Sequence, residues 1–426
     1  MDIKQKSILA KKASNLMNAA TSEVKNTALK NIAKALKKNA QALTEANRID
    51  IERSREANLA SPLLKRLKFD ESKIEEACNG LESLIGMKDP VGATLRAIEL
   101  DEGLELYKVS CPIGVVGVIF ESRPDALVQI SALCLKSANA VMLKGGSEAF
   151  ETNRLLADII TEASINSGIP QGWLTLMETR TDVAEMLAMD EYIDLIIPRG
   201  SNAFVRHIME NTHIPVLGHA DGICHVYIDS AADAEMAVKI SKDSKCQYVA
   251  VCNAAETILV HKDIAAEYLP EMKKTLEAEN VEIRGCSETL KFIDVKKATE
   301  EDWRTEYLDL IISVKVVSTI DDAISHINTY GSGHTDVIVT NDKERALKFM
   351  NLVDSADVFL NCSSRFSDGF RFGLGAEVGI STNKIHARGP VGLEGLLIYK
   401  WRLFGNGHIV ADYSGSNARS FTHRPL

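Results

Sequence analysis

The strongest constraint on the fold of this chain is a regular alternation of strand-like and helix-like segments. Short runs rich in Val, Ile and Leu are each followed by a longer amphipathic stretch, at 140–145 and 147–168, 174–178 and 181–189, 194–198 and 201–211, 224–229 and 231–243. A second series occupies 255–261 and 263–279, 312–317 and 320–331, 336–340 and 343–353. This order predicts parallel sheets with helices on both faces. We therefore expect two α/β domains with a ligand-binding cleft between them.

The remaining segments frame this alternation. Residues 1–90 have apolar positions at three- and four-residue steps, which is typical of amphipathic helices. Residues 89–103 contain Pro, Gly and charges, and suggest a linker. Residues 104–121 are strand-like, alternating at first and continuously apolar later, as in a buried parallel strand. Residues 410–426 suggest a loosely held tail.

Composition excludes several classes of function. A net charge of −10 argues against nucleic-acid and anionic-membrane partners. No apolar run approaches the roughly 18 residues of a membrane span, and the charged N-terminus lacks a signal peptide's apolar core. The eight cysteines form no CxxC pair and no zinc-finger spacing. We expect reduced thiols, no metal site and a cytoplasmic protein.

Cys252 differs from the other cysteines in its setting. It precedes Asn253 at the entry to the strand-like stretch 255–261 and shows no helical periodicity. Cysteine is among the most buried residue types, so a packing role is the simplest interpretation. The alternative is a thiolate nucleophile, which suits acyl chemistry because thioesters form and break readily.

Two strand-to-helix junctions are candidate cofactor sites. Gly200 and Ser201 follow a buried strand and begin a helix, where free N–H groups favour a phosphate, although Ser201 also suits an ordinary N-cap. Lys144 ends a strand before two glycines and a helix, where it reaches a ribose or 2′-phosphate or stays solvated. The glycine-rich 373–379 has the wrong spacing for a dinucleotide fingerprint.

Several longer stretches together resemble a known family. Residues 111–149, 168–178, 196–202, 218–229 and 252–261 come in the order and spacing of the aldehyde dehydrogenase superfamily. More narrowly, residues 317–339, with V-x5-A-x2-H-I, Tyr-Gly-Ser and His-Thr-Asp, are similar to the gamma-glutamyl phosphate reductase family, as are 361–369 and 372–396. The resemblance runs from the N-terminal helices to about residue 412.

This resemblance implies a fold and an activity. The expected fold is aldehyde dehydrogenase-like, with two parallel-sheet α/β domains, a cleft and a small β oligomerisation arm. The expected reaction is the NADPH-dependent reduction of L-glutamyl 5-phosphate to L-glutamate 5-semialdehyde and phosphate through a Cys252 thioester, the second step of proline biosynthesis from glutamate. The implied domains are 1–230 for the helices and cofactor, with the arm near 100–112, then 231–400 for catalysis and 401–426 for the rest of the arm and the tail.

The resemblance also assigns residues to cofactor and catalysis. Cys252 falls at the nucleophile, with Asn253 beside it in the catalytic site. Glu306 falls at the glutamate that holds the nicotinamide ribose. Lys144 is implied to contact the adenosine ribose or 2′-phosphate, and Gly200 with Ser201 the cofactor phosphates.

Two positions depart from the superfamily pattern. His219 replaces the glutamate that activates water in hydrolytic members, which suits an enzyme that must keep its thioester dry. It is either a polar core residue or a proton donor. Ser122 replaces the usual oxyanion-hole asparagine, so we place it with the substrate residues; the backbone N–H of Cys252 is the other candidate donor.

The substrate carries a carboxylate, an ammonium group and a phosphate, and so requires fixed charges. Arg123 and Arg365 are the candidate cations, with structural ion pairs as the alternative. Asp368 is the candidate partner of the ammonium group, and Asn361 is a polar neighbour.

The resemblance also implies partners for this protein and leaves rival functions to consider. Because 426 residues leave no room for a fused kinase, we expect a separate glutamate 5-kinase, and the arm implies a homodimer or larger homo-oligomer. The rivals are a CoA-acylating or non-phosphorylating aldehyde dehydrogenase and a catalytically silent relative. Joint retention of Cys252, Glu306 and Lys144 argues against the silent relative.

Overall fold

A four-stranded parallel sheet forms the first lobe of the protein. The computed structural model describes residues 1–178 and 181–426. The strand order is β5-β4-β3-β6, with β5 Leu174–Met177, β4 Ala140–Lys144, β3 Val115–Phe120 and β6 Leu195–Arg199. Alternate residues of β3 enter different cores, Val116 and Val118 on one face and Val115 and Ile119 on the other, as strand geometry requires. The sheet is therefore buried on both faces.

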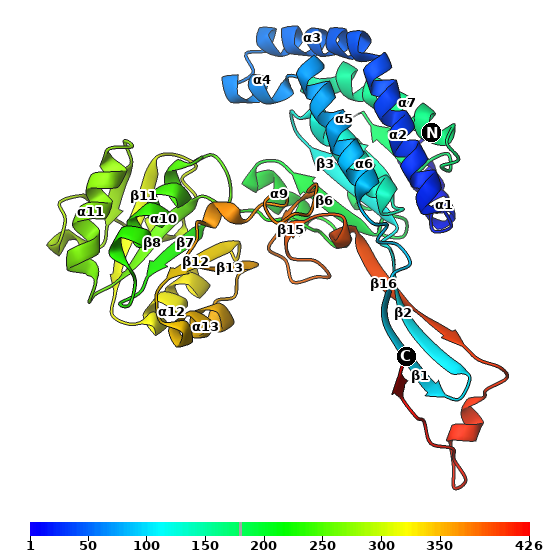
Figure 1. Ribbon diagram of the computed structural model, residues 1–426. Coiled ribbons are helices and arrows are strands. Elements are labelled where there is room, and N and C mark those ends of the chain that lie inside the picture. Colours follow the sequence, from blue (N-terminus) through cyan, green and yellow to red (C-terminus); the bar gives the residue numbers. More distant parts are fainter. Residues whose placement is uncertain (179–180) are drawn as a thin grey trace.

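Helices cover both faces of this sheet (Figure 1). The larger core is formed with α2 Ser22–Lys38, α5 Glu71–Gly86, α6 Pro124–Lys136 and α7 Phe150–Ile165. The other face packs on α1 Ile3–Met17, α8 Thr181–Leu187 and α9 Asn202–Glu210. Helices α3 Ala40–Glu56 and α4 Ser61–Leu67 lie at one end of the lobe.

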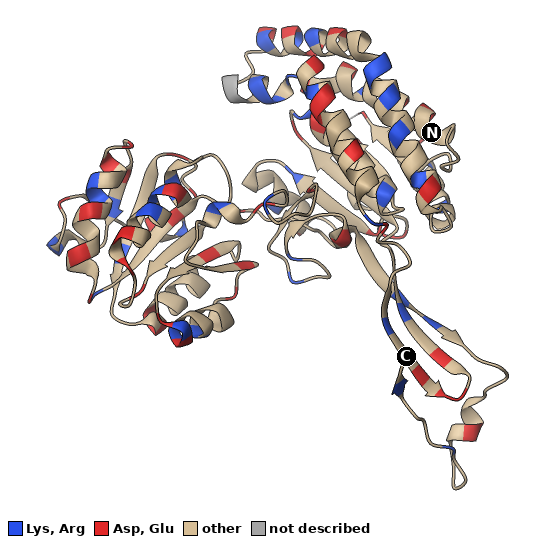
Figure 2. Cartoon of the chain, in the orientation of Figure 1, with Lys and Arg blue, Asp and Glu red and all other residues tan. Residues whose placement is uncertain are grey.

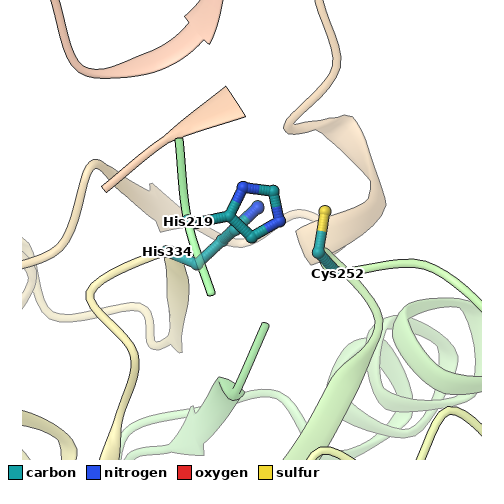
Figure 3. A group of neighbouring side chains, drawn as sticks. All are labelled: His219, Cys252 and His334. Atoms are coloured by element: carbon teal, nitrogen blue, oxygen red, sulfur yellow. The ribbon is translucent and has the colours of Figure 1, made fainter. Parts of the chain in front are cut away.

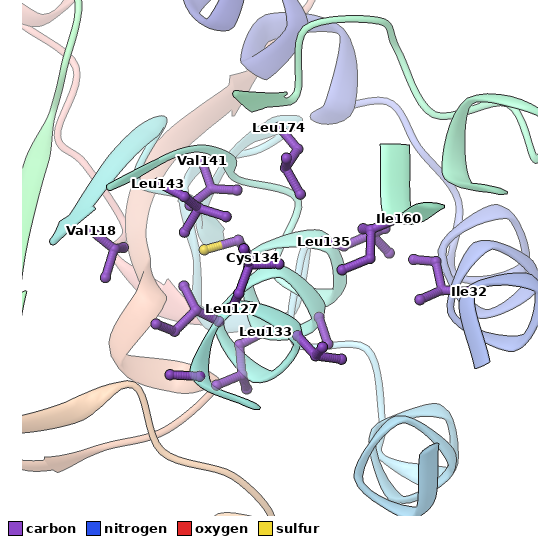
Figure 4. Packing of buried hydrophobic residues seen from close by; sticks show 14 of the residues in the cluster. Ile32, Val118, Leu127, Leu133, Cys134, Leu135, Val141, Leu143, Ile160 and Leu174 are labelled. Carbon is purple, nitrogen blue, oxygen red and sulfur yellow. The ribbon is translucent and has the colours of Figure 1, made fainter. Parts of the chain in front are cut away.

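The larger core shows what a structural cysteine looks like in this protein. Cys134 of α6 is fully buried, and its side chain lies in the same apolar cluster as Leu127, Val141 and Leu143 (Figure 4). Burial raises the pKa of its thiol to about 12, so it stays protonated. Cys134 therefore has the packing role that is usual for a buried cysteine.

A seven-stranded parallel sheet forms the second lobe. Its order is β10-β9-β11-β8-β7-β12-β13, with β10 Lys296–Lys297, β9 Glu282–Gly285, β11 Ile311–Val317, β8 Ala255–His261, β7 Cys224–Ile228, β12 Thr335–Val339 and β13 Asp357–Leu360. One face is covered by α10 Ala234–Cys246 and α11 Ala265–Glu277, the other by α12 Ile320–Tyr330 and α13 Lys343–Leu352. Two parallel-sheet lobes are thus present, as the alternation predicted.

The chain crosses between the lobes at other places than the sequence suggested. Strand β7 already belongs to the seven-stranded sheet, so the first sheet ends before residue 224 rather than at 230. After β13 the chain returns, because Val378, Val391 and Leu393 pack in the core of the first lobe. The short ribbon of β14 Gly379–Ser381 and β15 Gly389–Val391 lies on this returning segment.

An antiparallel arm projects from the first lobe (Figure 1). Its order is β16-β2-β1-β17, with β16 Leu397–Phe404, β2 Leu104–Pro112, β1 Thr94–Asp101 and β17 Arg424–Pro425. Most of the expected linker 89–103 is therefore strand β1. The strand-like stretch 104–121 divides at Gly114, which has φ +137° and lies so close to Asp194 that an added Cβ would come 2.8 Å from its Cγ.

The C-terminal segment is held to the arm rather than loose. Tyr413 Oη donates a hydrogen bond of 2.8 Å to Asp101 Oδ2, and Arg419 forms a 2.6 Å ion pair with the same carboxylate. Strand β17 pairs with β1. The segment is fixed by polar contacts although most of its side chains are exposed.

The molecular surface carries mixed charge. Figure 2 shows basic and acidic residues interspersed along the outer helices of both lobes. Within the described ranges, no helix has the length and apolar character needed to cross a membrane. The described part of the chain also contains six 3-10 turns: η1 Ser147–Ala149, η2 Thr289–Lys291, η3 Glu301–Arg304, η4 Ser364–Phe366, η5 Glu394–Leu396 and η6 Val410–Tyr413.

Candidate active site

Cys252 lies on the turn that enters β8 and lines a cavity of about 420 Å³. The cavity is also lined by the end of β6, the start of α9 and the segment around β14, which belong to the first lobe, whereas Cys252 precedes β8 of the second. Gly222 makes this placement possible, because an added Cβ there would come 2.6 Å from Cys252 Cβ. Unlike Cys134, Cys252 therefore faces a cavity that can hold a substrate.

Two histidines accompany the cysteine (Figure 3). Ligating atoms of His219, Cys252 and His334 all lie within 4.8 Å of one another. Nδ1 of His219 is 2.9 Å from the Ile380 carbonyl, which only accepts, so Nδ1 carries a proton and donates it to this hydrogen bond. Burial lowers the pKa of His334 well below its usual range, so this imidazole is neutral.

The resting thiol is protonated. Burial, reinforced by the negative charges of Glu306 and Glu377, raises the pKa of Cys252 to about 12. A thiol of this kind needs a base to become a nucleophile at neutral pH. His219 and His334 each have a ring nitrogen within 4.8 Å of the sulfur, and these imidazoles are the candidate acceptors for that proton.

Three arginines line the same cavity, namely Arg66, Arg123 and Arg199. Arg199 is the most deeply placed, and its Nη1 is buried without a hydrogen-bond partner. Glu377 also lines the cavity, and its Oε2 accepts a 2.7 Å hydrogen bond from the Gly369 N–H. The cavity thus presents several cations and one carboxylate, which suits a ligand with two anionic groups and one ammonium group.

A second, larger cavity of about 810 Å³ opens at the carboxyl ends of β3 and β4. It contains the buried Lys144, whose Nζ donates a 2.6 Å hydrogen bond to the Gly145 carbonyl. Its walls include apolar side chains from α4, α8 and α9, namely Leu63, Val183, Leu187 and Phe204. This is the edge of a parallel sheet where nucleotides bind in open α/β folds.

The two cavities adjoin at Gly200. This glycine lines the smaller cavity, and an added Cβ would lie 2.9 Å from Phe204 and 3.3 Å from Glu121, which both line the larger one. Ser201 is the N-cap residue of α9, without a side-chain capping bond. Glu306 reaches this point from the second lobe, where its Oε2 accepts a 2.6 Å hydrogen bond from Asn202 Nδ2.

Ser122 belongs to the larger cavity rather than to the cysteine. Its N–H and its hydroxyl both donate to Glu148 Oε1, at 2.6 and 2.7 Å. With its hydroxyl bound there, Ser122 holds Glu148 in place. Ser122 is not among the residues that line the Cys252 cavity, where we expected a substrate contact.

Three other predicted residues are engaged in local structure. Asn361 uses both ends of its amide on the backbone of Thr340, at 2.9 Å each. Asn253 Nδ2 donates to the Ser367 carbonyl at 2.7 Å and joins the cysteine turn to the segment after η4. Asp368 accepts from the Arg371 N–H at 3.0 Å. None of the three is among the residues that line the cysteine cavity.

The two predicted arginines differ in position. Arg123 lines the cysteine cavity and pairs with Asp125 at 2.8 Å. Arg365 is buried and is not among the residues that line this cavity. Its Nε donates a 2.9 Å hydrogen bond to Gln247 Oε1, and its positive charge acts to lower the pKa of Cys252.

Arg199, His334 and Glu377 were not selected from the sequence. Each lies inside a motif that was noted, in residues 196–202, 317–339 and 372–396, but the motif alone does not show which side chain points inward.

Comparisons with known proteins agree with this geometry. The model of the aldehyde dehydrogenase family matches residues 2–287. The gamma-glutamyl phosphate reductase of Acetivibrio thermocellus is 65% identical over 426 residues, which cover 100% of this chain and 99% of the relative. The chain belongs to the gamma-glutamyl phosphate reductases of the aldehyde dehydrogenase family.

Other gamma-glutamyl phosphate reductases support the assignment. The enzyme of Methanococcoides burtonii is 52% identical, with 100% of this chain and 97% of that protein covered. The crystal structure of the Thermotoga maritima gamma-glutamyl phosphate reductase superposes with a TM-score of 0.94 at 41% identity, covering 96% of this chain and 100% of that one. An acetylating aldehyde dehydrogenase from Geobacillus thermoglucosidasius, 17% identical with a TM-score of 0.65 over 96% and 97% of the chains, shares the fold.

Membership of the gamma-glutamyl phosphate reductases implies an oxidoreductase with a pyridine nucleotide cofactor. The residues present fit such a group. The larger cavity has an apolar wall and the buried Lys144, and it adjoins the Cys252 cavity at Gly200.

Proposed function

We propose that this protein reduces L-glutamyl 5-phosphate to L-glutamate 5-semialdehyde and phosphate with NADPH, the second step of proline biosynthesis. The observation that carries the proposal is Cys252 in a cavity lined by Arg66, Arg123 and Arg199. A substrate with a carboxylate and a phosphate needs at least two cations beside the nucleophile. The names of the relatives point to the same substrate.

Cys252 and His219 supply the chemistry of the acyl group. His219 Nε2 takes the thiol proton, and the sulfur attacks the acyl carbon. The C–O bond to phosphate breaks, phosphate leaves, and a glutamyl thioester remains on Cys252. When bound, the cofactor would supply a hydride, and its addition to the acyl carbon would convert this thioester to a thiohemiacetal on Cys252. The thiohemiacetal then releases the aldehyde, and the sulfur recovers a proton from His219.

The arginines and Glu377 position the substrate. Arg199 has an unpartnered buried Nη1, so a substrate oxygen would satisfy it. Glu377 replaces Asp368 as the partner of the ammonium group, because it lines the cavity. With Ser122 elsewhere, the backbone N–H of Cys252 is the proposed oxyanion donor.

Lys144, Gly200 and Ser201 are proposed to hold the cofactor, together with Glu306 near the nicotinamide ribose. Preference for NADPH rests on Lys144, a cation in the larger cavity. Glu148 in the same cavity opposes a 2′-phosphate by its charge, so the two nucleotides must be compared directly.

The arm is proposed to join copies of the chain. Strand β16 exposes Tyr399, Trp401, Leu403 and Phe404, an apolar edge that association would cover. Light scattering of the purified protein gives the size of the assembly. A separate glutamate 5-kinase as supplier of the substrate and a cytoplasmic location stay predictions.

The reverse reaction tests the proposed function. Purified protein is mixed with glutamate 5-semialdehyde and NADP⁺, and absorbance is followed with phosphate, with CoA and with neither. We expect that NADP⁺ is reduced only when phosphate is present. This activity should be lost in Cys252→Ser and kept in Cys286→Ser. Reduction without phosphate would identify a hydrolytic enzyme, and reduction that requires CoA an acylating one.

A further inference from the structure

The arrangement of donor atoms around Cys252 has a second chemical meaning. The His219 and His334 rings meet edge to face with centroids 5.0 Å apart, and a nitrogen of each lies within 4.8 Å of the cysteine sulfur (Figure 3). One thiol and two imidazoles are the donors that Zn²⁺ prefers. The mechanism proposed above uses only one of the two histidines.

Both imidazoles are oriented by their other nitrogen. His219 Nδ1 donates to the Ile380 carbonyl at 2.9 Å, and His334 Nδ1 lies 2.8 Å from the Thr335 hydroxyl. His334 Nε2 is buried without a hydrogen-bond partner, which is costly unless something binds it. Metal-ligating histidines are commonly held in this way, by a carbonyl or another polar group on the second nitrogen.

We propose that His219, Cys252 and His334 bind Zn²⁺ and form a reversible inhibitory site. Three protein ligands leave a fourth position, and since Cys252 and His219 line the substrate cavity, water can occupy it. With Zn–N near about 2.0 Å and Zn–S near about 2.3 Å, tetrahedral ligand atoms lie roughly 3.3 to 3.6 Å apart. Binding therefore requires the farthest pair to close by roughly 1.5 Å at most.

The chemistry of binding is a simple exchange. The S–H bond of Cys252 breaks, its proton goes to solvent, and the sulfur forms a bond to Zn²⁺. No oxidant or reductant takes part. A sulfur bound to zinc cannot attack an acyl phosphate, so turnover stops until the metal is removed. The inhibition rests on the proposed function, whereas the binding does not.

Cobalt provides a direct readout of the site. Co²⁺ is added to the reduced full-length protein, and the near-ultraviolet sulfur-to-cobalt charge-transfer band is recorded, followed by its displacement with Zn²⁺. We expect one equivalent to bind, with the band absent in Cys252→Ser. Cys286→Ser is the matched control, because Cys286 is also a half-buried free thiol but lies beside Thr289 instead. A band that persists in Cys252→Ser would overturn the proposal.

The histidines are tested separately. We expect His334→Asn to weaken Zn²⁺ binding by more than about tenfold, since losing an outer partner alone has effects of that size. Because His334 is fully buried, His219→Asn at the half-buried position provides a second measure, with circular dichroism to check folding. Unchanged affinity in both folded variants would show that the cysteine binds alone and would overturn the proposed site.

Alkylation connects binding to reactivity without requiring turnover. Stoichiometric Zn²⁺ should block modification of Cys252 by iodoacetamide, and a chelator should restore it, as read by mass spectrometry. In the reductase assay the same Zn²⁺ should abolish phosphate-dependent activity reversibly. If the protein lacks that activity, the cobalt and alkylation results still decide on the metal site. Alkylation that Zn²⁺ leaves unchanged would contradict it.

Discussion

Gly222 packs directly against Cys252, with no room for a side chain between them. An added Cβ would come 2.6 Å from Cys252 Cβ, and still closer to its backbone. Backbone atoms cannot move aside as a flexible side chain can, so any other residue at position 222 displaces Cys252.

Gly222→Ala should therefore damage catalysis more than folding. We expect kcat to fall by about 100-fold, the effect of moving a reacting group by about 1 Å. Steady-state kinetics and thermal unfolding measure the two effects. Gly86→Ala in α5 is the control, because nothing lies within 4 Å of the added Cβ there. If Gly222→Ala and Gly86→Ala had the same kcat, the close approach of Gly222 to Cys252 would not matter for catalysis.

Arg199→Met should impair substrate binding. A charged hydrogen bond contributes about 1.5 to 3 kcal/mol, so we expect KM for the acyl phosphate, or for phosphate in reverse, to rise roughly 10- to 100-fold. The exposed Arg48→Met is the control. A normal KM with reduced kcat would instead place Arg199 at the transition state.

Lys144→Met should reduce the preference for NADPH over NADH. Lys144 is the cation that we assign to the 2′-phosphate, and NADH lacks that group. We expect kcat/KM to fall more for NADPH than for NADH, by roughly tenfold or more. Initial rates with both nucleotides measure this ratio, with exposed Lys239→Met as the control. An equal loss for both nucleotides would assign Lys144 to a group they share.

The buried His326 should make the free energy of unfolding depend on pH. Burial, with the positive charges of His225 and Lys315, lowers its pKa to about 2, against about 6.5 in an unfolded chain. Below about pH 6.5 the unfolded state binds a proton at this histidine and the folded state does not. The free energy of unfolding therefore falls as pH falls, by about 1.4 kcal/mol per pH unit from this group. Above pH 7 the group contributes no pH dependence.

Urea unfolding at several pH values tests this. The free energy of unfolding should decline less steeply between pH 6.5 and 5 in His326→Phe than in the unaltered protein. Phe suits the site because Trp303 and Tyr330 already contact the ring of His326. Parallel slopes in the two proteins would mean that His326 titrates normally.

The alternation of strands and helices determined the fold class, because each apolar run must be buried and each amphipathic stretch must cover it. It did not determine which sheet a strand joins. β7 continues the first series along the chain, yet it pairs with β8 and β12. Likewise most of the charged stretch 89–103 forms β1, which pairs with the adjacent β2 and, at long range in the sequence, with β17, a contact that local composition does not record.

For the site, the motifs predicted Cys252 as the nucleophile and Lys144 as the cofactor cation, and the structure places the two residues in adjoining cavities. Only the tertiary structure decided which polar side chains face Cys252. Ser122 and Asn361 turn to Glu148 and Thr340, whereas Arg199 and His334 come to the cysteine from other elements. A motif shows which residue is present, but the direction of its side chain depends on hydrogen-bond partners from distant parts of the chain.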